Sequence, residues 1–406
     1  MTDCKSYGQD FIFWFGPNVR LVVPHPEIIK EILSTKFGNY PKPPTDPLAR
    51  QLLGKGLVDL KGEKWAQHRK IINPAFHMDR LKGMIPTIVR SGANMLDGWS
   101  KLILSGASEI DVQKEFNDLT ADVISRTAFG SSFTEGKHIF EMQNKQMILV
   151  VDSFRSVYIP GFRFLPTAKN RQRWNVEKEI RRSLRQIIDG RERTDITEKS
   201  GRYGADLLGF MMSESKEQGR VDVKSNGSLS TEEIIDELKT FYFAGHESTS
   251  VLLQWTIILL GIHQDWQERG HREVIEVCGK NNYPDADSLS RLKTVGMIVN
   301  EVLRLYPPAV HILRMAHEPM KLGRLSIPAG TQLEIPMILL CGETMPMIST
   351  QGDLMKELQR LQSIQLVLAM ILQKFSFATS PSYTHAPSLL PILKPQYGAQ
   401  LIFCME

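Results

Sequence analysis

The feature that most constrains this chain is one long helical pattern at residues 230–262, which becomes apolar on all sides in its second half. It opens with STEE at 230–233, a capping box in which Ser230 and Glu233 satisfy orphan backbone N–H groups. Such a helix would be about 50 Å long at about 1.5 Å per residue. A helix that is apolar all round crosses the middle of a core, so the other elements must pack around it.

The centre of this pattern is interrupted by AGHEST at 244–249. A glycine inside a helix costs about 1 kcal/mol relative to alanine, and a buried carboxylate costs more unless it is paired. One interpretation is a hydrated kink or a helix-packing notch. The other is a reaction groove, in which Ala244 and Gly245 leave room for a ligand while Glu247, Ser248 and Thr249 deliver protons.

Two shorter spacings place charged side chains on one helical face. Trp65 and Arg69 lie four apart, a pairing that can hold a carboxylate of a large flat ligand, or that is only a half-buried indole beside an arginine. Glu301 and Arg304 lie three apart in a helix expected over 288–306, which the prolines at 307 and 308 end. The same spacing recurs at 179/182 and 357/360, so a surface ion pair is the alternative.

Outside these motifs the apolar spacing is mostly helical, between two strand-rich regions. Residues 11–23 predict a hairpin, 320–340 predict short strands around a turn at 327–331, and 389–403 predict two more strands. Loops are expected at 41–47, 157–167 and 216–230. We see no internal repeat or linker, so the sequence predicts one mostly helical domain over 1–406 with a small β lobe.

Composition excludes several classes of function. The chain has 49 Lys and Arg against 45 Asp and Glu, an even balance that argues against nucleic acid as a partner. Its four cysteines have no paired spacing, which argues against disulfides and zinc. Residues 248–264 are uncharged but polar in part and shorter than the about 20 residues of a spanning helix. We therefore expect no transmembrane anchor. Hydrolase and nucleotide-binding motifs are also missing.

In their order along the chain, the motifs WxxxR at 65–69, AGxEST at 244–249, ExxR at 301–304, LYPP at 305–308 and Arg314 resemble a cytochrome P-450. The stretches GKGLVDLKGEKW at 54–65 and NPAF at 73–76 resemble the plant microsomal members of the seventy-two clan. The resemblance covers about 11–340 and about 366–403. It implies a mostly helical fold and a haem-thiolate monooxygenase that oxidises a small lipophile, terpenoid or hormone-like, with O₂ and electrons from an NADPH-dependent reductase.

The resemblance also implies a role for several residues around the haem. Trp65, Arg69 and Arg314 would bind the haem propionates. Glu301 and Arg304 would be structural and would lock the helix behind the haem.

On the oxygen side, the resemblance places Ala244 and Gly245 beside the cofactor and gives Glu247 a catalytic role. The hydroxyl that follows the acid is usually threonine in the family but is Ser248 here, with Thr249 next. Serine keeps the donor and loses the methyl group that restricts the rotamer, so we expect looser oxygen activation.

The sequence departs from the family at the iron ligand. The family's loop, Phe-x-x-Gly-x-Arg-x-Cys-x-Gly, is not in this sequence, although LVLAMILQK at 366–374 matches the helix that follows it. A thiolate favours O–O cleavage, and hydroxyl or amide side chains cannot replace it. Cys341 lacks the surrounding loop and lies 25 residues before Leu366, which makes it a very weak candidate. Cys278 and Cys404 are worse, so we predict no metal ligand.

We interpret residues 341–365 as an out-of-frame or mis-spliced segment that replaces the family's sequence, leaving the fold incomplete near the C-terminus. Family-like sequence stops at Leu340 and returns at Leu366. An intact reading frame across this stretch in many independent transcripts would contradict the hypothesis. The segment can still form a helix from Asp353 with an apolar inner face at Leu354, Leu358, Leu361 and Ile364.

The sequence leaves two functions open. One is the family's monooxygenase. The other is a catalytically inactive, haem-poor remnant that retains the scaffold and binds a lipophile or a partner. The family is attached to the cytosolic face of the endoplasmic reticulum, but its anchor and hinge are not found before the first hairpin, so a cytosolic or peripheral location is expected. The apolar residues 157–166 line an access channel, touch a membrane surface or pack internally.

Overall fold

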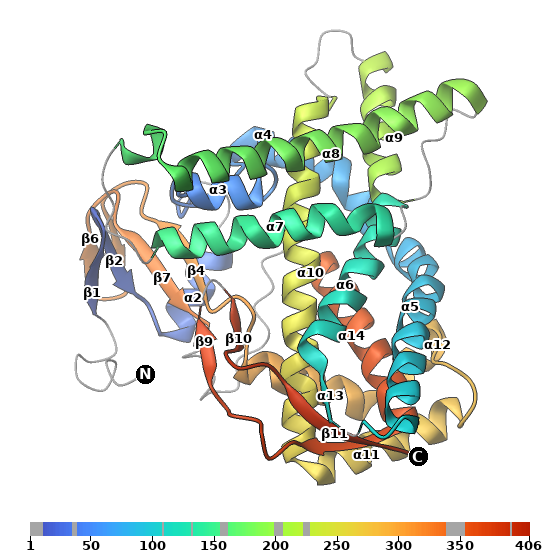
Figure 1. Cartoon of the computed structure of the whole chain (residues 1–406). Helices are drawn as coiled ribbons and strands as arrows, with labels where there is room; N and C mark the ends of the chain where they lie inside the picture. The colour runs from blue at the N-terminus through green and yellow to red at the C-terminus, as the bar shows by residue number, and fades with distance from the viewer. Residues whose placement is uncertain are drawn as a thin grey trace.

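The computed structural model of the chain describes residues 11–34, 39–107, 109–130, 133–154, 161–198, 206–221, 228–337, 354–389 and 392–406. Helices form most of it and surround one long central helix, α10 (Figure 1). The predicted class, mostly α with a small β lobe, is confirmed. The helices are α2 (Pro26–Ser34), α3 (Pro47–Leu53), α4 (Gly62–Ile72), α5 (Met78–Leu104), α6 (Val112–Phe129), α7 (Phe133–Phe154), α8 (Ala168–Glu198), α9 (Leu207–Val221), α10 (Thr231–Ile262), α11 (Gln264–Cys278), α12 (Ala286–Arg291), α13 (Lys293–Leu305) and α14 (Leu354–Lys374).

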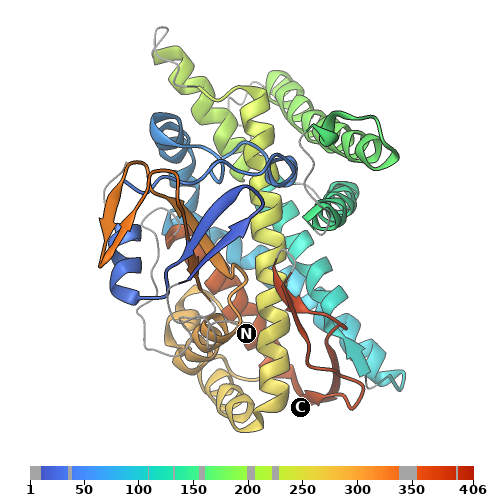
Figure 2. The same cartoon turned by 90° about the vertical axis from the view of Figure 1, so that its left-hand side faces the viewer.

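The helix α10 is the long buried helix that the sequence predicts. Ser230 caps it, and both hydrogen bonds of the capping box with Glu233 are present. Its second half packs into an apolar core that α5, α6, α11, α13 and α14 complete. Its first half packs into another core with α4, α6, α8 and α9. The turned view shows α10 running through the height of the molecule between the small sheets (Figure 2).

Two charged residues in the first half of α10, Glu237 and Lys239, are fully buried, and each has a partner on another helix. The Lys239 ammonium is fully buried and donates to Glu177 of α8 at 2.5 Å. Glu237, also fully buried, accepts from His68 of α4 at 2.7 Å and from the Leu57 backbone N–H at 3.1 Å. Burial lowers the pKa of Lys239, while the Lys239 charge holds the pKa of Glu177 below its usual range despite burial.

The small sheets lie at two places beside the helices (Figures 1 and 2). The largest has the order β1-β2-β7-β4, with β2 and β7 parallel and the other pairs antiparallel. The helix α2 packs on it through Ile29 and Ile32. A second sheet, β3-β11-β8, is antiparallel throughout. The strands are β1 (Ile12–Phe15), β2 (Asn18–Val22), β3 (Glu109–Asp111), β4 (His311–Met315), β5 (Met320–Leu322), β6 (Leu325–Ile327), β7 (Gln332–Pro336), β8 (Phe375–Thr379), β9 (Pro387–Leu389), β10 (Leu393–Pro395) and β11 (Gln400–Met405).

Several local predictions are confirmed. The hairpin at 11–23 is β1 and β2. The turn at 327–331 lies between β6 and β7, and Gly330 there has a positive φ of 83°, which a side chain would disfavour. The helix predicted from Asp353 begins at Leu354 and continues to Lys374, and Leu361 and Ile364 are buried in the core as expected. Cys341 and the side chains of Leu354 and Leu358 lie outside the described residues.

Other local predictions are wrong. The single helix expected over 288–306 is two helices, because Leu292 leaves the helical conformation, with φ −77° and ψ 74°, between α12 and α13. Asp285 and Ser288 form a capping box that starts α12 earlier than predicted. The loop expected from 216 is still helical, since α9 continues to Val221. In the described part of 157–166, Phe164 is 68% exposed, so that part does not pack internally.

Among the described residues, no helix combines the length and the apolar content needed to cross a bilayer.

The buried ion pair predicts a large loss of stability for Lys239→Met. Removing one partner of a buried pair costs about 3–5 kcal/mol. Because Arg181 also pairs with Glu177 at 2.7 Å, we expect a loss near the lower end of this range, and Lys239→Met combined with Glu177→Gln should cost less. As a control, Arg182→Gln removes an exposed partner of Glu179 on the same helix α8 and should leave the free energy of unfolding almost unchanged. Urea denaturation measures all three variants. A Lys239→Met protein as stable as the control would contradict the pairing.

Candidate functional site

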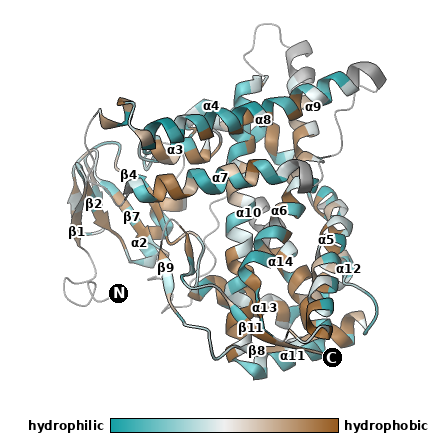
Figure 3. Cartoon of the chain, in the orientation of Figure 1, coloured by the Kyte–Doolittle hydropathy of each residue, from teal (hydrophilic) through white to brown (hydrophobic). Residues whose placement is uncertain are grey.

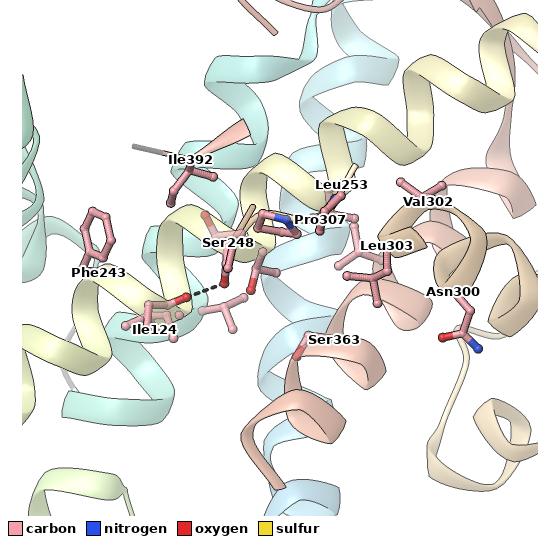
Figure 4. Close-up of a pocket in the computed structure, with 18 of the residues that line it drawn as sticks. Ile124, Phe243, Ser248, Leu253, Asn300, Val302, Leu303, Pro307, Ser363 and Ile392 are labelled. Carbon is pink, nitrogen blue, oxygen red and sulfur yellow. Dashed lines mark hydrogen bonds between the residues drawn. The ribbon is translucent and has the colours of Figure 1, made fainter. Parts of the chain in front are cut away.

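A cavity of about 1390 Å³ lies beside the middle of α10. Residues of α6, α10, α13, α14 and β4 supply most of its walls, and these are predominantly apolar. Figure 4 shows lining side chains of α6, α10, α13 and α14, with Ser248 and Leu253 from α10 near Pro307, which follows α13. The cavity is large enough to hold a drug-sized ligand, because such sites typically measure about 300–1,000 Å³.

The interrupted segment of α10 faces this cavity. Ala244, Gly245, Ser248 and Thr249 all line it, as the groove interpretation predicts. The Ser248 hydroxyl donates to the Ala244 carbonyl oxygen at 2.5 Å (Figure 4). Its proton is therefore held on the helix backbone, while its oxygen lone pairs remain able to accept a hydrogen bond from a ligand.

Gly245 serves helix packing as well as the cavity. A Cβ atom at this position would meet the Cδ1 atom of Ile124 of α6 at 2.6 Å, closer than real Cβ contacts allow. The glycine is therefore a packing notch that also lines the cavity, and its role as room beside a ligand stays a prediction. The close approach of α6 to α10 brings the Ile124 side chain to the cavity wall.

Glu247 does not lie among the residues that line the cavity. Its carboxylate is 3.6 Å from Nδ1 of His246, whose Nε2 donates to the Asn117 backbone oxygen at 3.1 Å. Burial works to raise the pKa of Glu247, but His246 and the Lys394 charge outweigh it and leave the pKa below its usual range. The structure thus separates this acid from the hydroxyl of Ser248 that the sequence pairs with it.

Trp65 and Arg69 share one face of α4, as their spacing predicts. The Arg69 guanidinium carbon lies 5.7 Å from the centre of the Trp65 indole ring, and Arg69 is buried. The Lys42 ammonium lies 6.0 Å from the same ring centre. Neither Trp65 nor Arg69 lines the cavity.

Arg314 lies in β4, which lines the cavity through His311 and Ile312. Its Nη1 donates to the Leu313 carbonyl oxygen at 2.9 Å. The N–H of the next residue, Met315, donates to the Pro41 carbonyl oxygen at 2.9 Å, and this joins β4 to the segment that carries Lys42. The segment with Pro41 and Lys42 therefore contacts both β4, which carries Arg314, and α4, which carries Arg69.

Glu301 and Arg304 form the predicted pair on α13. Arg304 donates from Nε and Nη2 to the two Glu301 oxygens at 2.8 and 2.6 Å. The hydrogen bond from Arg304 lowers the pKa of Glu301. Both side chains line the cavity, and they are 55% and 40% exposed.

Sequence reasoning missed the contribution of α6. Thr120, Ile124 and Thr127 line the cavity from one face of this helix, and their spacing of four and three residues is the signal that could have identified them. The two threonine hydroxyls donate to backbone carbonyls within α6, at 2.8 and 2.7 Å. Two histidines, His263 and His311, also line the cavity.

The chain matches the cytochrome P-450 family model over residues 3–341. The chain belongs to the cytochrome P-450 family. It is 42% identical to cytochrome P-450 CYP72A616 of Paris polyphylla over 98% of this chain and 82% of that protein. It is 41% identical to cytochrome P-450 734A1 of Arabidopsis thaliana, over 98% and 81%, and 40% identical to 72A15 of the same plant, over 98% and 82%.

These matches confirm the predicted resemblance to plant P-450 proteins, whose family consists of haem-dependent monooxygenases. The family match ends at Cys341, one residue after the point where the sequence analysis placed the end of family-like sequence. The alignment with the Paris polyphylla protein extends over 428 residues, more than the 406 of this chain, so that protein has residues without a counterpart here. Membership of the family implies that a reductase donates the electrons and that the substrate is lipophilic.

The walls of the cavity fit a haem only in part. Its volume and apolar lining suit a large apolar group, and Arg69 and Arg314 are cations in two elements, α4 and β4, that the segment at 41–42 contacts. The thiolate that the family uses is missing from the described lining, since Cys278 lies in α11 and Cys404 in β11. The residues that the structure describes around the cavity therefore do not fit a thiolate-bound iron, and no reaction step is assigned to it.

The contact between Gly245 and Ile124 predicts a measurable coupling between these two positions. At Gly98 of α5 an added Cβ meets nothing, so Gly98→Ala should raise the free energy of unfolding by about 0.5–1 kcal/mol. Gly245→Ala should lose this gain, because the new methyl group meets Ile124. In an Ile124→Val background, which lacks that Cδ1 atom, Gly245→Ala should be more favourable by about 0.5 kcal/mol or more. Urea denaturation of the four proteins of this cycle measures the coupling, and strictly additive effects would contradict the contact.

Proposed function

We propose that this P-450 chain binds a small lipophilic molecule, terpenoid or hormone-like, in the cavity beside α10, and that it binds little haem and does not insert oxygen. The observation that carries the proposal is an apolar cavity of about 1390 Å³ with no cysteine among its described lining residues.

The binding half of the proposal rests on the shape and chemistry of the walls. Leu253 and Phe243 of α10, Ile124 of α6 and Val302 of α13 give an apolar surface from three helices. Ser248 adds an oxygen that can accept a hydrogen bond, as a hydroxylated lipophile would require. Burial of a ligand against such walls is driven by the removal of apolar surface from water.

The second part of the proposal, that the chain binds little haem and does not insert oxygen, rests on the lack of a cysteine ligand for the iron. The sequence lacks the family's cysteine loop. A thiolate supplies the electron density that favours O–O cleavage, and the oxygens of Ser248 and Thr249 are not equivalent donors. Neither of the two described cysteines lines the cavity: Cys278 is at the end of α11 and Cys404 is exposed on β11.

A second function, monooxygenation of the same lipophile, is favoured by one observation. Ser248 and Thr249 both line the cavity, and the sequence resemblance assigns the family's oxygen-side hydroxyl to Ser248, with Thr249 next. This function requires a cysteine sulfur bound to the iron. An absorption spectrum that reports this bond therefore distinguishes the two functions.

The reduced carbon monoxide difference spectrum of the purified 406-residue protein distinguishes them. The protein should be produced with an excess of haem precursor, beside a relative that has the cysteine loop as a positive control. We expect the thiolate band from the control and no such band from this chain. A thiolate band from this chain would overturn the proposal and establish the second function.

A further inference from the structure

A second cavity, of about 320 Å³, lies between α3 and α8. These two helices are neighbours near the upper end of α10 in Figure 1, and α8 is largely hydrophilic there (Figure 3). None of the described residues that line it also lines the cavity beside α10. We propose that this second cavity is a binding site for a phosphate-type oxyanion, and this proposal does not depend on the proposed function.

The residues that line this second cavity carry far more positive than negative charge. Five cations line this cavity against one carboxylate: Arg50, Lys55, Arg163, Arg173, Arg181 and Glu177. Clustered cations around a concave surface raise the local concentration of anions.

Part of this positive charge is already neutralised. Arg181 donates to Glu177 at 2.7 Å and to Asp236 of α10 at 2.6 Å. Arg50 donates to Asp59 at 3.1 Å. The excess positive charge therefore lies on the three other cations, Lys55, Arg163 and Arg173.

Arg173 is the strongest indication of a bound anion. It is only 6% exposed, yet its guanidinium donates to neutral oxygens, to Ser153 Oγ at 2.9 Å and to Asn170 Oδ1. Within the described ranges it makes no ion pair with a carboxylate. Asp152 acts on it at longer range, but that carboxylate is paired with Lys169 at 2.6 Å. A buried charge is costly unless it is paired, so an anion in the cavity would supply the missing partner.

Two more buried atoms of lining residues favour phosphate among the oxyanions. Nε of Arg50 and Oε1 of Gln51 have no hydrogen-bond partner among the residues that the structure describes. The first is a donor and the second an acceptor. A monohydrogen phosphate or a phosphomonoester offers both an oxyanion and, when singly protonated, a hydroxyl group, whereas sulfate at neutral pH has no hydroxyl. Free phosphate and the headgroup of phosphatidic acid share this chemistry.

Isothermal titration of the full chain with inorganic phosphate tests the soluble source, and co-sedimentation with phosphatidylcholine vesicles, with or without phosphatidic acid, tests the lipid source. We expect saturable binding in at least one arm. Because charge-assisted hydrogen bonds are the strong ones, Arg173→Gln should weaken binding roughly tenfold. The matched control is Arg182→Gln, the same change on an exposed arginine of α8 outside the cavity, and it should bind as the wild type does.

A second variant, Lys55→Gln, tests the site if Arg173→Gln does not fold. Lys55 lines the cavity but is exposed, so its replacement should not disturb folding. It should weaken binding about twofold to threefold. Binding of phosphate that depends on these residues supports a soluble ligand, and binding only to phosphatidic acid vesicles supports a headgroup. The proposal is overturned if neither arm shows binding, if sulfate binds as tightly as phosphate, or if Arg182→Gln weakens binding as much as the cavity variants.

Discussion

Buried charges in the first half of α10 set the orientation of the whole helix. Lys239 and Glu237 are fully buried, and a buried ion is tolerated only where its partners are in place. Lys239 reaches Glu177 of α8, and Glu237 reaches His68 of α4, so α10 cannot rotate without breaking both contacts. The second half of the helix is mostly apolar, and the bonds that it makes to other elements are uncharged: Ser250 donates to Asn117 of α6 at 2.5 Å, and Trp255 donates to the Leu393 carbonyl oxygen at 2.8 Å.

The fixed rotation decides which residues of α10 face the cavity. Ala244 and Ser248 are one turn apart and share a face, whereas Glu247 is turned toward His246 and the Lys394 charge. The approach of α6 at Gly245 then closes one wall, since Ile124 fills the space of the missing side chain. The site is thus a consequence of helix packing that local sequence alone does not specify.

How far the sequence predicts this structure depends on whether the signal is local. The bounds of α10 follow from the Ser230 capping box and a continuous apolar pattern, and the first hairpin follows from its turn. The break at Leu292 has no sequence marker because neither proline nor glycine occurs there. The strand β3 is three residues long and pairs with β11 at the far end of the chain, so its register depends on tertiary contacts. Trp65 with Arg69 and Glu301 with Arg304 are paired as predicted, but only tertiary structure shows that the second pair lines the cavity and the first does not.

The claim that joins these observations is that α10 forms one wall of an assembled lipophile-binding cavity. It is tested by fluorescence titration of the purified chain with an uncharged apolar dye such as Nile red. We expect one saturable site, and Ala244→Phe, which fills the cavity, should weaken binding roughly tenfold. Ile262→Phe places the same ring at the exposed end of the same helix and should leave the affinity unchanged. Binding that never saturates, or that Ala244→Phe weakens no more than Ile262→Phe does, would show that the cavity is not the site.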